Sequence, residues 1–335
     1  MPGGAPTWAL RHPKSYIGEK DMSKKAKKAL EAGHVTKGQW TWHLMKRYKI
    51  GYLMILPFMI VFFLYTVIPV LSTIVVSFTD YNMLQWPNWV GLQNYTTLFL
   101  DDDLFIIALK NTLVFAVAVG PASFILSFVV AWFINELSPR MRSFVTLIFY
   151  APSISVSAYT IFKYVFSSDS QGLVNSWLLN WGLIDSPILF FQNAKYIMPL
   201  CIIIALWMSL GNAFLSFIAG LQGVDRSQYE AAAVDGITNR WQELWYVTLP
   251  NMVSNLMFGV VMSITGSFGF GAVITSLVGD NMSTDYAAYT LIHHISEYGD
   301  TRMEIGSSSA ISFLLFLIQI TANMVIVKAL AKVGK

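Results

Sequence analysis

The chain has 335 residues, of which 55% are hydrophobic and 12% are charged, and its formal net charge is +3. Because soluble domains carry about 25% charged residues, this composition excludes an ordinary soluble protein and indicates a membrane protein. The single cysteine, Cys201, excludes a disulfide framework and a metal site made of cysteines.

Residues 1–50 form a basic segment with aromatic residues near its end, among them Trp40, Trp42 and Tyr48. This pattern is typical of a cytoplasmic juxtamembrane segment, with lysines near anionic lipid and aromatic rings at the headgroups. An arm that binds nucleic acid is the less favoured alternative, and we expect no nucleic-acid partner. The following apolar run is too long for a cleaved signal peptide, so we expect the first span to stay in the mature protein.

Residues 51–335 contain six continuous apolar segments, each long enough for the roughly 20 helical residues that cross a bilayer. The segments lack the short alternating pattern of barrel strands. We therefore predict an all-α integral membrane protein with six transmembrane helices. The predicted spans are residues 51–78, 112–134, 143–166, 196–220, 252–276 and 308–331.

Lysine and arginine are distributed unevenly between the two sides of these spans. Eleven of the 22 lie in residues 1–50, and others lie in the 135–142 loop, in the 222–249 loop and after Val327. Cytoplasmic loops are enriched in these residues, so we predict that both termini and the 222–249 loop are cytoplasmic.

Sequence motifs for nucleotide binding by a P-loop, for zinc proteases and for serine hydrolases are absent. His293 and His294 are adjacent, so on a helix they point about 100° apart and suit a metal poorly. The span centres hold no ionisable side chain, whereas ion-driven transporters usually keep one there. We therefore expect no metal, no cofactor, no catalytic residue and no energy source within this chain.

The loop at residues 222–250 is predicted to form two short helices joined by a hinge. Asp225 is placed to cap a first helix, and Gly236 follows where a helix end favours a residue that accepts positive φ. Either Thr238 or Asn239 caps a second helix, and Pro250 is predicted to open the fifth span. The alternative is an amphipathic connector that lies on the membrane.

This loop resembles the conserved loop of permease subunits of ATP-binding-cassette (ABC) importers: E-A-A, three residues, G, a spacer, then I-x-L-P. Valine replaces the isoleucine, and the spacer after the glycine has ten residues where the pattern has about nine. "SFTDYN" and "WVGLQNYTTLF", at 77–82 and 89–99, resemble the sugar-importer branch, similar to the larger maltose-type permease subunit. The residues that match the loop pattern are Glu230, Ala231, Ala232, Gly236, Val247, Leu249 and Pro250.

The resemblance implies a type I importer permease, in the bacterial cell membrane, whose loop seats in a cytoplasmic ATPase. It implies four kinds of partner: a second related permease, an ATPase dimer that binds ATP and magnesium, an extracytoplasmic binding protein and a sugar. The residues expected to couple this chain to the ATPase are Glu230, Ala231, Ala232, Asp235, Gly236, Leu249 and Pro250.

Composition agrees with such a seat, because consecutive alanines leave a low helix face that fits into a groove. Trp241 and Trp245 are four residues apart and form an apolar stripe on the second helix. The alternative is that these tryptophans pack on the chain's own spans or at the membrane interface.

A sugar path is expected between the fourth and fifth spans. Trp207, Gly211 and Phe214 are predicted to form an aromatic stripe, and Asn212 is interpreted as a buried amide in need of a partner. The small residues of the fifth span recur on one helical face, which is also a pattern for close helix packing. The residues expected to line the path are Trp207, Ser209, Asn212, Phe214, Ser263, Ser267 and Phe270.

Acidic residues gather in segments 79–110 and 277–306, including "DDD" at 101–103. We expect most of them to be solvated, with some serving as a docking surface for the binding protein. Together the patterns predict a permease subunit of an ATP-driven importer for a sugar, expected to be an oligosaccharide. The alternatives are a self-contained secondary transporter, which lacks the usual charges in its spans here, and a membrane enzyme, which lacks a catalytic constellation.

Overall fold

The computed structural model describes residues 48–155, 158–279 and 284–333 and divides the chain into two units, Met1–Leu71 and Ser72–Lys335. Within these residues the regular structure is helical, apart from one isolated β-bridge between Thr79 and Trp89. Nearly all of the predicted basic segment, residues 1–50, lies outside the described residues.

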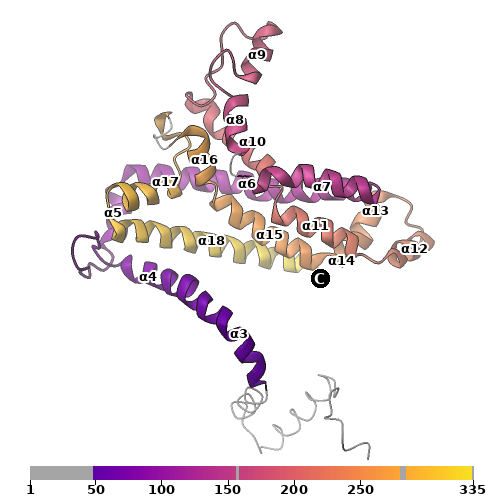
Figure 1. The fold of residues 1–335 in the computed structure, drawn as a ribbon, viewed down its shortest axis with the longest axis horizontal. Helices are drawn as coiled ribbons and strands as arrows, with labels where there is room; N and C mark the ends of the chain where they lie inside the picture. Colours follow the sequence, from indigo (N-terminus) through magenta and orange to yellow (C-terminus); the bar gives the residue numbers. More distant parts are fainter. Residues whose placement is uncertain (1–47, 156–157, 280–283, 334–335) are drawn as a thin grey trace, which may run out of the picture. The chain divides into compact units, whose positions relative to one another are not determined.

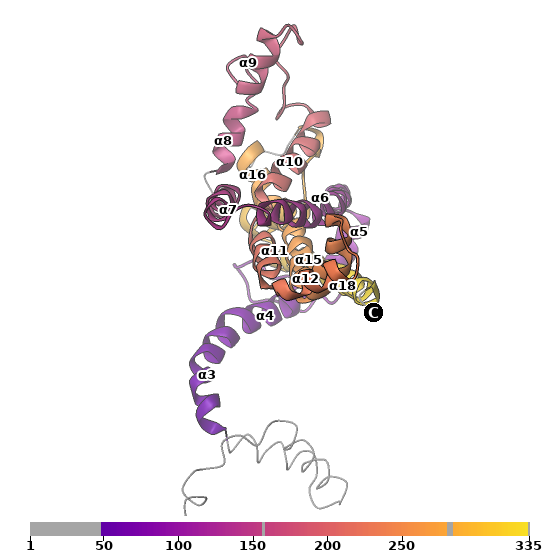
Figure 2. The same cartoon turned by 90° about the vertical axis from the view of Figure 1, so that its right-hand side faces the viewer.

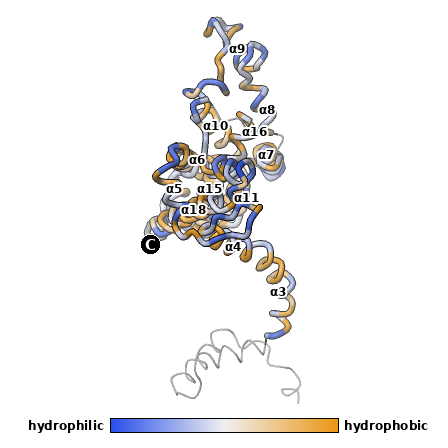
Figure 3. Tube along the Cα trace, turned by 90° about the vertical axis from the view of Figure 1, so that its left-hand side faces the viewer, coloured by the Kyte–Doolittle hydropathy of each residue, from blue (hydrophilic) through white to orange (hydrophobic). Residues whose placement is uncertain are grey.

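The first unit holds α3 (Lys49–Phe62), the π-helical turn η2 (Phe63–Val67) and the start of α4 (Ile68–Val76). No residue of α3 is buried, although the helix is apolar, as its colouring shows in Figure 3. A helix that is apolar all round requires lipid or another protein as its surroundings. The run Lys49–Val76 is long and apolar enough to cross a membrane, which confirms the first predicted span at 51–78.

The second unit consists of helices of very different lengths joined mostly by short loops, with longer connections at 77–92 and 181–193 (Figures 1 and 2). Two of its helices, α6 and α18, are long enough to cross a bilayer without a break. The elements of this unit after α4 are α5 (Gln93–Leu100), α6 (Asp103–Asn135), α7 (Pro139–Ile154), α8 (Ala158–Val165), α9 (Leu173–Asn180), α10 (Ala194–Met208), α11 (Asn212–Gly223), α12 (Arg226–Val234), α13 (Arg240–Glu243), η3 (Leu244–Thr248), α14 (Leu249–Asn251), α15 (Val253–Phe268), α16 (Gly271–Val278), η4 (Thr284–Tyr286), α17 (Leu291–Ser296), η5 (Glu297–Thr301) and α18 (Ile305–Val333).

The core of the second unit is a bundle of α6, α11 and α15, with α18 packed along α15. Small residues allow these helices to approach closely. At Gly220 an added Cβ would come within 2.8 Å of Asn255 Cγ, and Gly259 lies directly against the ring of Phe217. Asn255 Nδ2 also donates to Ser216 O at 3.0 Å, so α11 and α15 are joined by a hydrogen bond as well as by packing.

Four helical runs are long and apolar enough to cross a membrane, and the number rises to six if each of two bent pairs is one span. The second, fourth and sixth predicted spans correspond to the runs Asp103–Asn135, Ala194–Gly223 and Ile305–Ala329. The second run starts earlier than predicted because Asp102 caps it with its side chain.

The fourth predicted span is interrupted at 209–211, between α10 and α11, and two further predicted spans are not single helices either. The segment predicted at 143–166 is the pair α7 and α8, bent by 87° after Pro152, which removes one backbone donor from α7. The segment predicted at 252–276 contains only α15 and most of α16, with a break at Gly269 and Phe270. Continuous apolar sequence conceals both breaks, because hydropathy alone does not register a change of direction.

Candidate coupling surface and substrate path

The helix that carries the E-A-A residues, α12, lies at one end of the second unit, and α5 and α17 lie at the other end (Figure 1). Asp225 Oδ1 accepts from the backbone N–H of Ser227 at 3.0 Å, which confirms the predicted cap at the start of α12. The fold thus presents this short polar helix away from the core.

The end of α12 forms a Schellman motif. The N–H of Ile237 donates to Ala232 O at 3.0 Å, and the N–H of Gly236 donates to Ala233 O at 3.2 Å. Gly236 has φ +90°, a conformation that residues with a side chain rarely adopt. The predicted role of Gly236 as the residue that ends α12 is confirmed, and Asp235 immediately before it is exposed.

The two faces of α12 differ in what they contact. Ala232 is buried against the chain itself, so it does not form part of an open docking face. Glu230, Ala231 and Val234 are exposed, and Val234 keeps 88% of its surface. Ala231 and Ala233 are exposed whereas Ala232 is not, since neighbouring residues on a helix point about 100° apart, and the seating of the exposed alanines in a groove stays a prediction.

Side-chain hydrogen bonds tie α12 to the segment that leads into α15. The hydroxyls of Tyr229 and Thr248 lie 3.0 Å apart, and Asn251 Nδ2 donates to Gln228 Oε1. A displacement of α12 therefore reaches η3 and α14 directly.

Asn239, one of the two predicted caps, begins the second helix: its Oδ1 accepts from the N–H of Trp241 at 3.0 Å. Trp241 also places its ring 5.1 Å from that of Trp132 near the end of α6. It nevertheless stays 59% exposed, and Trp245 stays 64% exposed. Trp241 therefore packs in part on α6, and both tryptophans keep apolar surface available.

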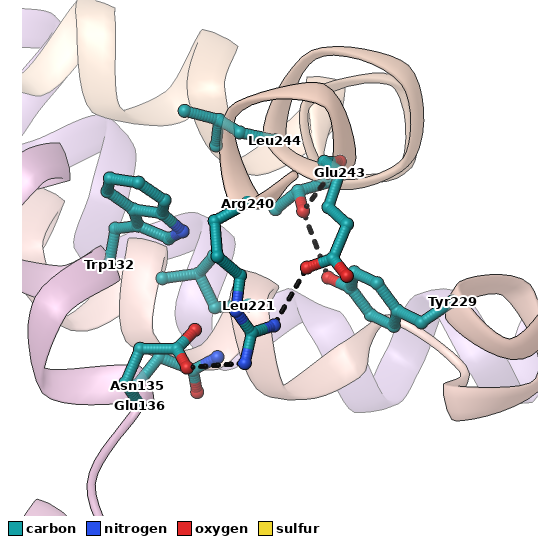
Figure 4. A pocket seen from close by; sticks show the side chains of 9 residues that line it. Trp132, Asn135, Glu136, Leu221, Tyr229, Arg240, Glu243 and Leu244 are labelled. Carbon is teal, nitrogen blue, oxygen red and sulfur yellow. Dashed lines mark hydrogen bonds and ion pairs between the residues drawn. The ribbon is translucent and has the colours of Figure 1, made fainter. Parts of the chain in front are cut away.

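Arg240 links this loop to α6, as Figure 4 shows. Its Nη1 lies 2.7 Å from Glu243 Oε2 and its Nη2 lies 3.0 Å from Glu136 Oε2, at the end of α6. The side chains border a cavity of about 130 Å³ that Trp132 and Leu221 also line. The sequence patterns give no sign of this contact, because Glu136 and Arg240 lie in different loops.

Leu249 and Pro250 belong to α14, a helix of three residues. Pro250 lies in its first turn, but α14 ends at Asn251 and the run Arg240–Asn251 meets α15 at a bend of 84°. The prediction that Pro250 opens the fifth span is therefore wrong, since α15 starts only at Val253, beyond the bend.

The expected path residues of the fourth span do not share one face. Trp207 is 50% exposed, whereas Phe214 is fully buried. The helix is interrupted between them, where Ser209 Oγ donates to Leu206 O at 2.7 Å and Gly211 adopts φ −111° and ψ −129°. Asn212 is exposed at the start of α11, so its interpretation as a buried amide is wrong.

The expected path residues of the fifth span point mainly into the bundle. Ser263 and Ser267 are buried, and Ser267 Oγ donates to Ile264 O at 2.7 Å. Phe270 is half-buried, with its ring 5.5 Å from that of Phe115. Of the small residues on this helix, Gly266 is open to its surroundings. A path role for the two serines therefore stays a prediction, and their present contacts are those of helix packing.

A buried polar network closes the α17 end of the unit. Asp102 Oδ2 accepts from His294 Nε2 and from the Tyr298 hydroxyl, each at 2.8 Å, while Tyr289 OH lies 3.0 Å from His294 Nδ1. A neutral imidazole with its proton on Nε2 satisfies all these contacts. The sequence interpretation of "DDD" as solvated is therefore wrong for Asp102, and it holds for its exposed neighbours Asp101 and Asp103.

The network shifts the pKa values of its members in a consistent way. Burial lowers the pKa of His294, although the charge and the hydrogen bond of Asp102 act in the opposite direction. Burial acts to raise the pKa of Asp102, but the hydrogen bonds from Tyr298, Phe105 and His294 hold it below its usual value. Burial and the bond to Asp102 raise the pKa of Tyr298 to about 12. The network therefore holds an ionised carboxylate beside a neutral histidine at neutral pH.

Comparison with known proteins relates this architecture to one transport family. Residues 123–332 match the model of the binding-protein-dependent transport system inner membrane component. The chain is 34% identical over 221 residues to the probable ABC transporter permease protein YesP of Bacillus subtilis, covering 65% of this chain and 70% of that one. It is 28% identical over 279 residues to the arabinooligosaccharides transport system permease protein AraP of the same organism, covering 83% and 87%. With the lactose transport system permease protein LacF of Rhizobium radiobacter the identity is 32%, covering 65% and 72%.

Solved structures agree on the fold. A chain of a bacterial ABC transporter involved in the import of the acidic polysaccharide alginate has a TM-score of 0.68 and 27% identity, covering 85% of this chain and 97% of that one. A chain of an alginate ABC transporter crystallised with its pentasaccharide-bound periplasmic protein has a TM-score of 0.70 at 24% identity, covering 84% and 94%. With the matched region spanning most of the second unit, the chain belongs to the family of binding-protein-dependent transport system inner membrane components, as a multi-pass ABC importer permease.

Proposed function

We propose that this chain is one of two permease subunits of an ATP-driven importer for an oligosaccharide that an extracytoplasmic binding protein delivers. The observation that carries the proposal is α12, whose E-A-A residues form a capped helix at one end of the unit. Its exposed residues, Glu230, Ala231 and Val234, form the face on which the ATPase dimer docks. ATP and magnesium bind to that ATPase and not to this chain.

The choice of an oligosaccharide is supported by what the relatives transport. Their names specify arabinooligosaccharides, lactose and polygalacturonan or rhamnogalacturonan, and the solved neighbours import alginate. The exposed Trp207 and Asn212 offer what a sugar needs: an aromatic face for a ring and an amide for hydroxyl groups.

The orientation of the chain follows from its charges. The lysine and arginine excess lies on the side of the termini and of α12, so we place these in the cytoplasm and α17 outside. The second permease subunit covers apolar surface that this chain leaves open on its spans, such as Phe258 and Met262 of α15.

Purification tests the proposal. A tag on this chain, after mild extraction from native membranes, should recover an ATPase and a second permease in stoichiometric amounts. The substitution Val234→Glu places a charge on the α12 face, and we expect it to reduce ATPase recovery at least tenfold. Leu84→Glu is the matched control, because Leu84 is equally exposed at 87% but lies before α5, and it should recover the ATPase normally.

Uptake of radiolabelled arabinooligosaccharides, lactose and alginate oligosaccharides by cells with and without the gene tests the substrate class. Uptake of one of them should require both this chain and ATP. Sugar uptake by the purified chain alone, without an ATPase, would contradict the proposal and establish a self-contained transporter.

A further inference from the structure

We propose that Arg240 is a positioning residue that makes the end of α6 move together with α12 when the ATPase acts. The inference rests on the proposed function and adds to it the route by which motion passes from the loop to the spans. Its basis is the pair of contacts that one guanidinium makes with Glu136 and Glu243.

The contacts of the loop define two routes into the bundle. Tyr229 and Gln228 connect α12 to η3 and α14, and hence along the chain to α15. Polar contact with α6 is made by Arg240 through Glu136, beside the stacking of Trp241 on Trp132. Because α6 packs against both α11 and α15, a pull on its end reaches the whole bundle.

The chemistry of Arg240 suits a link between two elements. Its planar guanidinium holds two carboxylates at once, Glu243 from its own helix and Glu136 from α6, which a lysine ammonium does with less geometric definition. Glu136 immediately follows α6, where a cation is also favoured by the helix dipole. The ion pairs are partly exposed, so their effect on stability is small, and their importance lies in where they hold the loop.

A cavity of about 130 Å³ lies beside the ion pair between Arg240 and Glu136. Its lining includes Leu221 and Leu244 together with the three charged side chains, so the space beneath the guanidinium is not filled by the core. Apolar packing alone therefore does not fix the loop against α6 at this point. The ion pair between Arg240 and Glu136 holds the two elements together across the open space.

The test measures the separation of the loop and α6 directly. Spin labels at Thr238→Cys and Phe133→Cys, both exposed positions, report the distance between the hinge after α12 and the end of α6. The complex with its ATPase is examined without nucleotide and after trapping with ATP, magnesium and vanadate. In the otherwise unchanged chain we expect the distance to stay the same in both states, because the two elements move together.

Two glutamate variants separate a link between elements from simple folding of the loop. Glu136→Gln breaks only the contact to α6, and we expect the distance to change on the order of 2 Å upon trapping, the size of helix shifts in allosteric proteins. Glu243→Gln breaks only the contact within the loop and should leave the distance unchanged. Arg140→Gln removes a nearby exposed arginine that forms no ion pair with the described residues, and it is the control for lost charge.

The outcomes are distinct. An unchanged distance in Glu136→Gln would overturn the inference, and so would an equal change in Glu243→Gln, which would show a role in loop folding only. Thermal unfolding of each complex provides the second readout, and all three variants should unfold at the wild-type temperature. ATP hydrolysis by the same preparations tests the proposed function separately. If the chain retains no ATPase, both the proposed function and the role of Arg240 are refuted. If the complex hydrolyses ATP but the distance is unchanged in Glu136→Gln, only the role of Arg240 is refuted.

Discussion

Replacing Gly259 by alanine tests whether the small residues of α15 serve helix packing. An added Cβ at this position would overlap the ring of Phe217 on α11. That ring is fully buried and is held edge-on between Phe124, at 5.4 Å, and Phe128, at 5.7 Å. Since the ring is fully buried against two aromatic rings of α6, we expect the methyl group to force α15 and α11 apart.

The magnitude follows from two opposing terms. Overpacking of a filled core costs about 1–3 kcal/mol, and the enclosed ring places this site near the upper value. Alanine gains about 1 kcal/mol over glycine in helix propensity. We therefore expect Gly259→Ala to lower the free energy of unfolding by about 2 kcal/mol.

Gly266→Ala is the matched control on the same helix, because an added Cβ at Gly266 meets nothing within 4 Å. It should leave stability unchanged or raise it by up to about 1 kcal/mol. Denaturant titration of the purified complex in mixed micelles measures both variants. The double variant Gly259→Ala with Phe217→Leu should be less destabilised than the sum of the single changes, because the smaller side chain relieves the overlap. If Gly259→Ala proves as stable as Gly266→Ala, the packing explanation of this helix face is refuted.

Four further changes probe the hinge, the α17 end and the path. The side chain of Gly236→Val meets open space, but the residue must adopt φ +90°, which costs about 1–3 kcal/mol locally. ATP-dependent transport should therefore fall while membrane insertion persists. Normal transport would show that the hinge at Gly236 has no role. Replacing Asp101 and Asp103 together by asparagine should slow uptake more at low salt than at high salt, if these exposed charges guide the binding protein; an unchanged salt response leaves them as solvated loop residues. Asn212→Leu should impair sugar uptake while both permease subunits still co-purify, because its side chain is exposed; loss of the partner subunit would instead identify a packing surface. The lowered pKa of His294 means that the unfolded chain binds a proton more readily than the folded chain, so stability should fall as the pH drops below about 6.5. This fall should be smaller in His294→Gln. Identical pH profiles of thermal unfolding in the two proteins would exclude the network as the cause of the fall.

The parts of the structure that the sequence predicted well are governed by local rules. Asp225, Gly236 and Asn239 each act on backbone groups within a few residues, so their spacing alone defines the ends of α12 and α13. The number of apolar runs follows from composition in the same way, because each run must satisfy its backbone within one helix.

The parts that the sequence did not reveal depend on which way a helix faces. A span that is apolar on all sides gives no sign of its inner face, and a glycine or serine repeat looks the same whether it packs or lines a path. Gly259 and Ser263 illustrate this, since both are buried although the repeat suggested a path. Asp102 lies within three adjacent acids, yet its partner His294 is far away in sequence, so composition alone indicated a solvated residue.

The two ends of the second unit differ in how their polar side chains are held. At the α17 end, the largely buried side chains of Asp102, His294 and Tyr298 are hydrogen-bonded to one another, so they are fixed together. At the α12 end, Arg240 and Glu136 form an exposed pair beside an open cavity, which adds little to stability but joins the loop to α6 beside the stacked rings of Trp241 and Trp132. In the proposed importer, where an ATPase acts on the α12 end, this asymmetry is suitable, because the α12 end has to follow the ATPase while the α17 end keeps a defined shape.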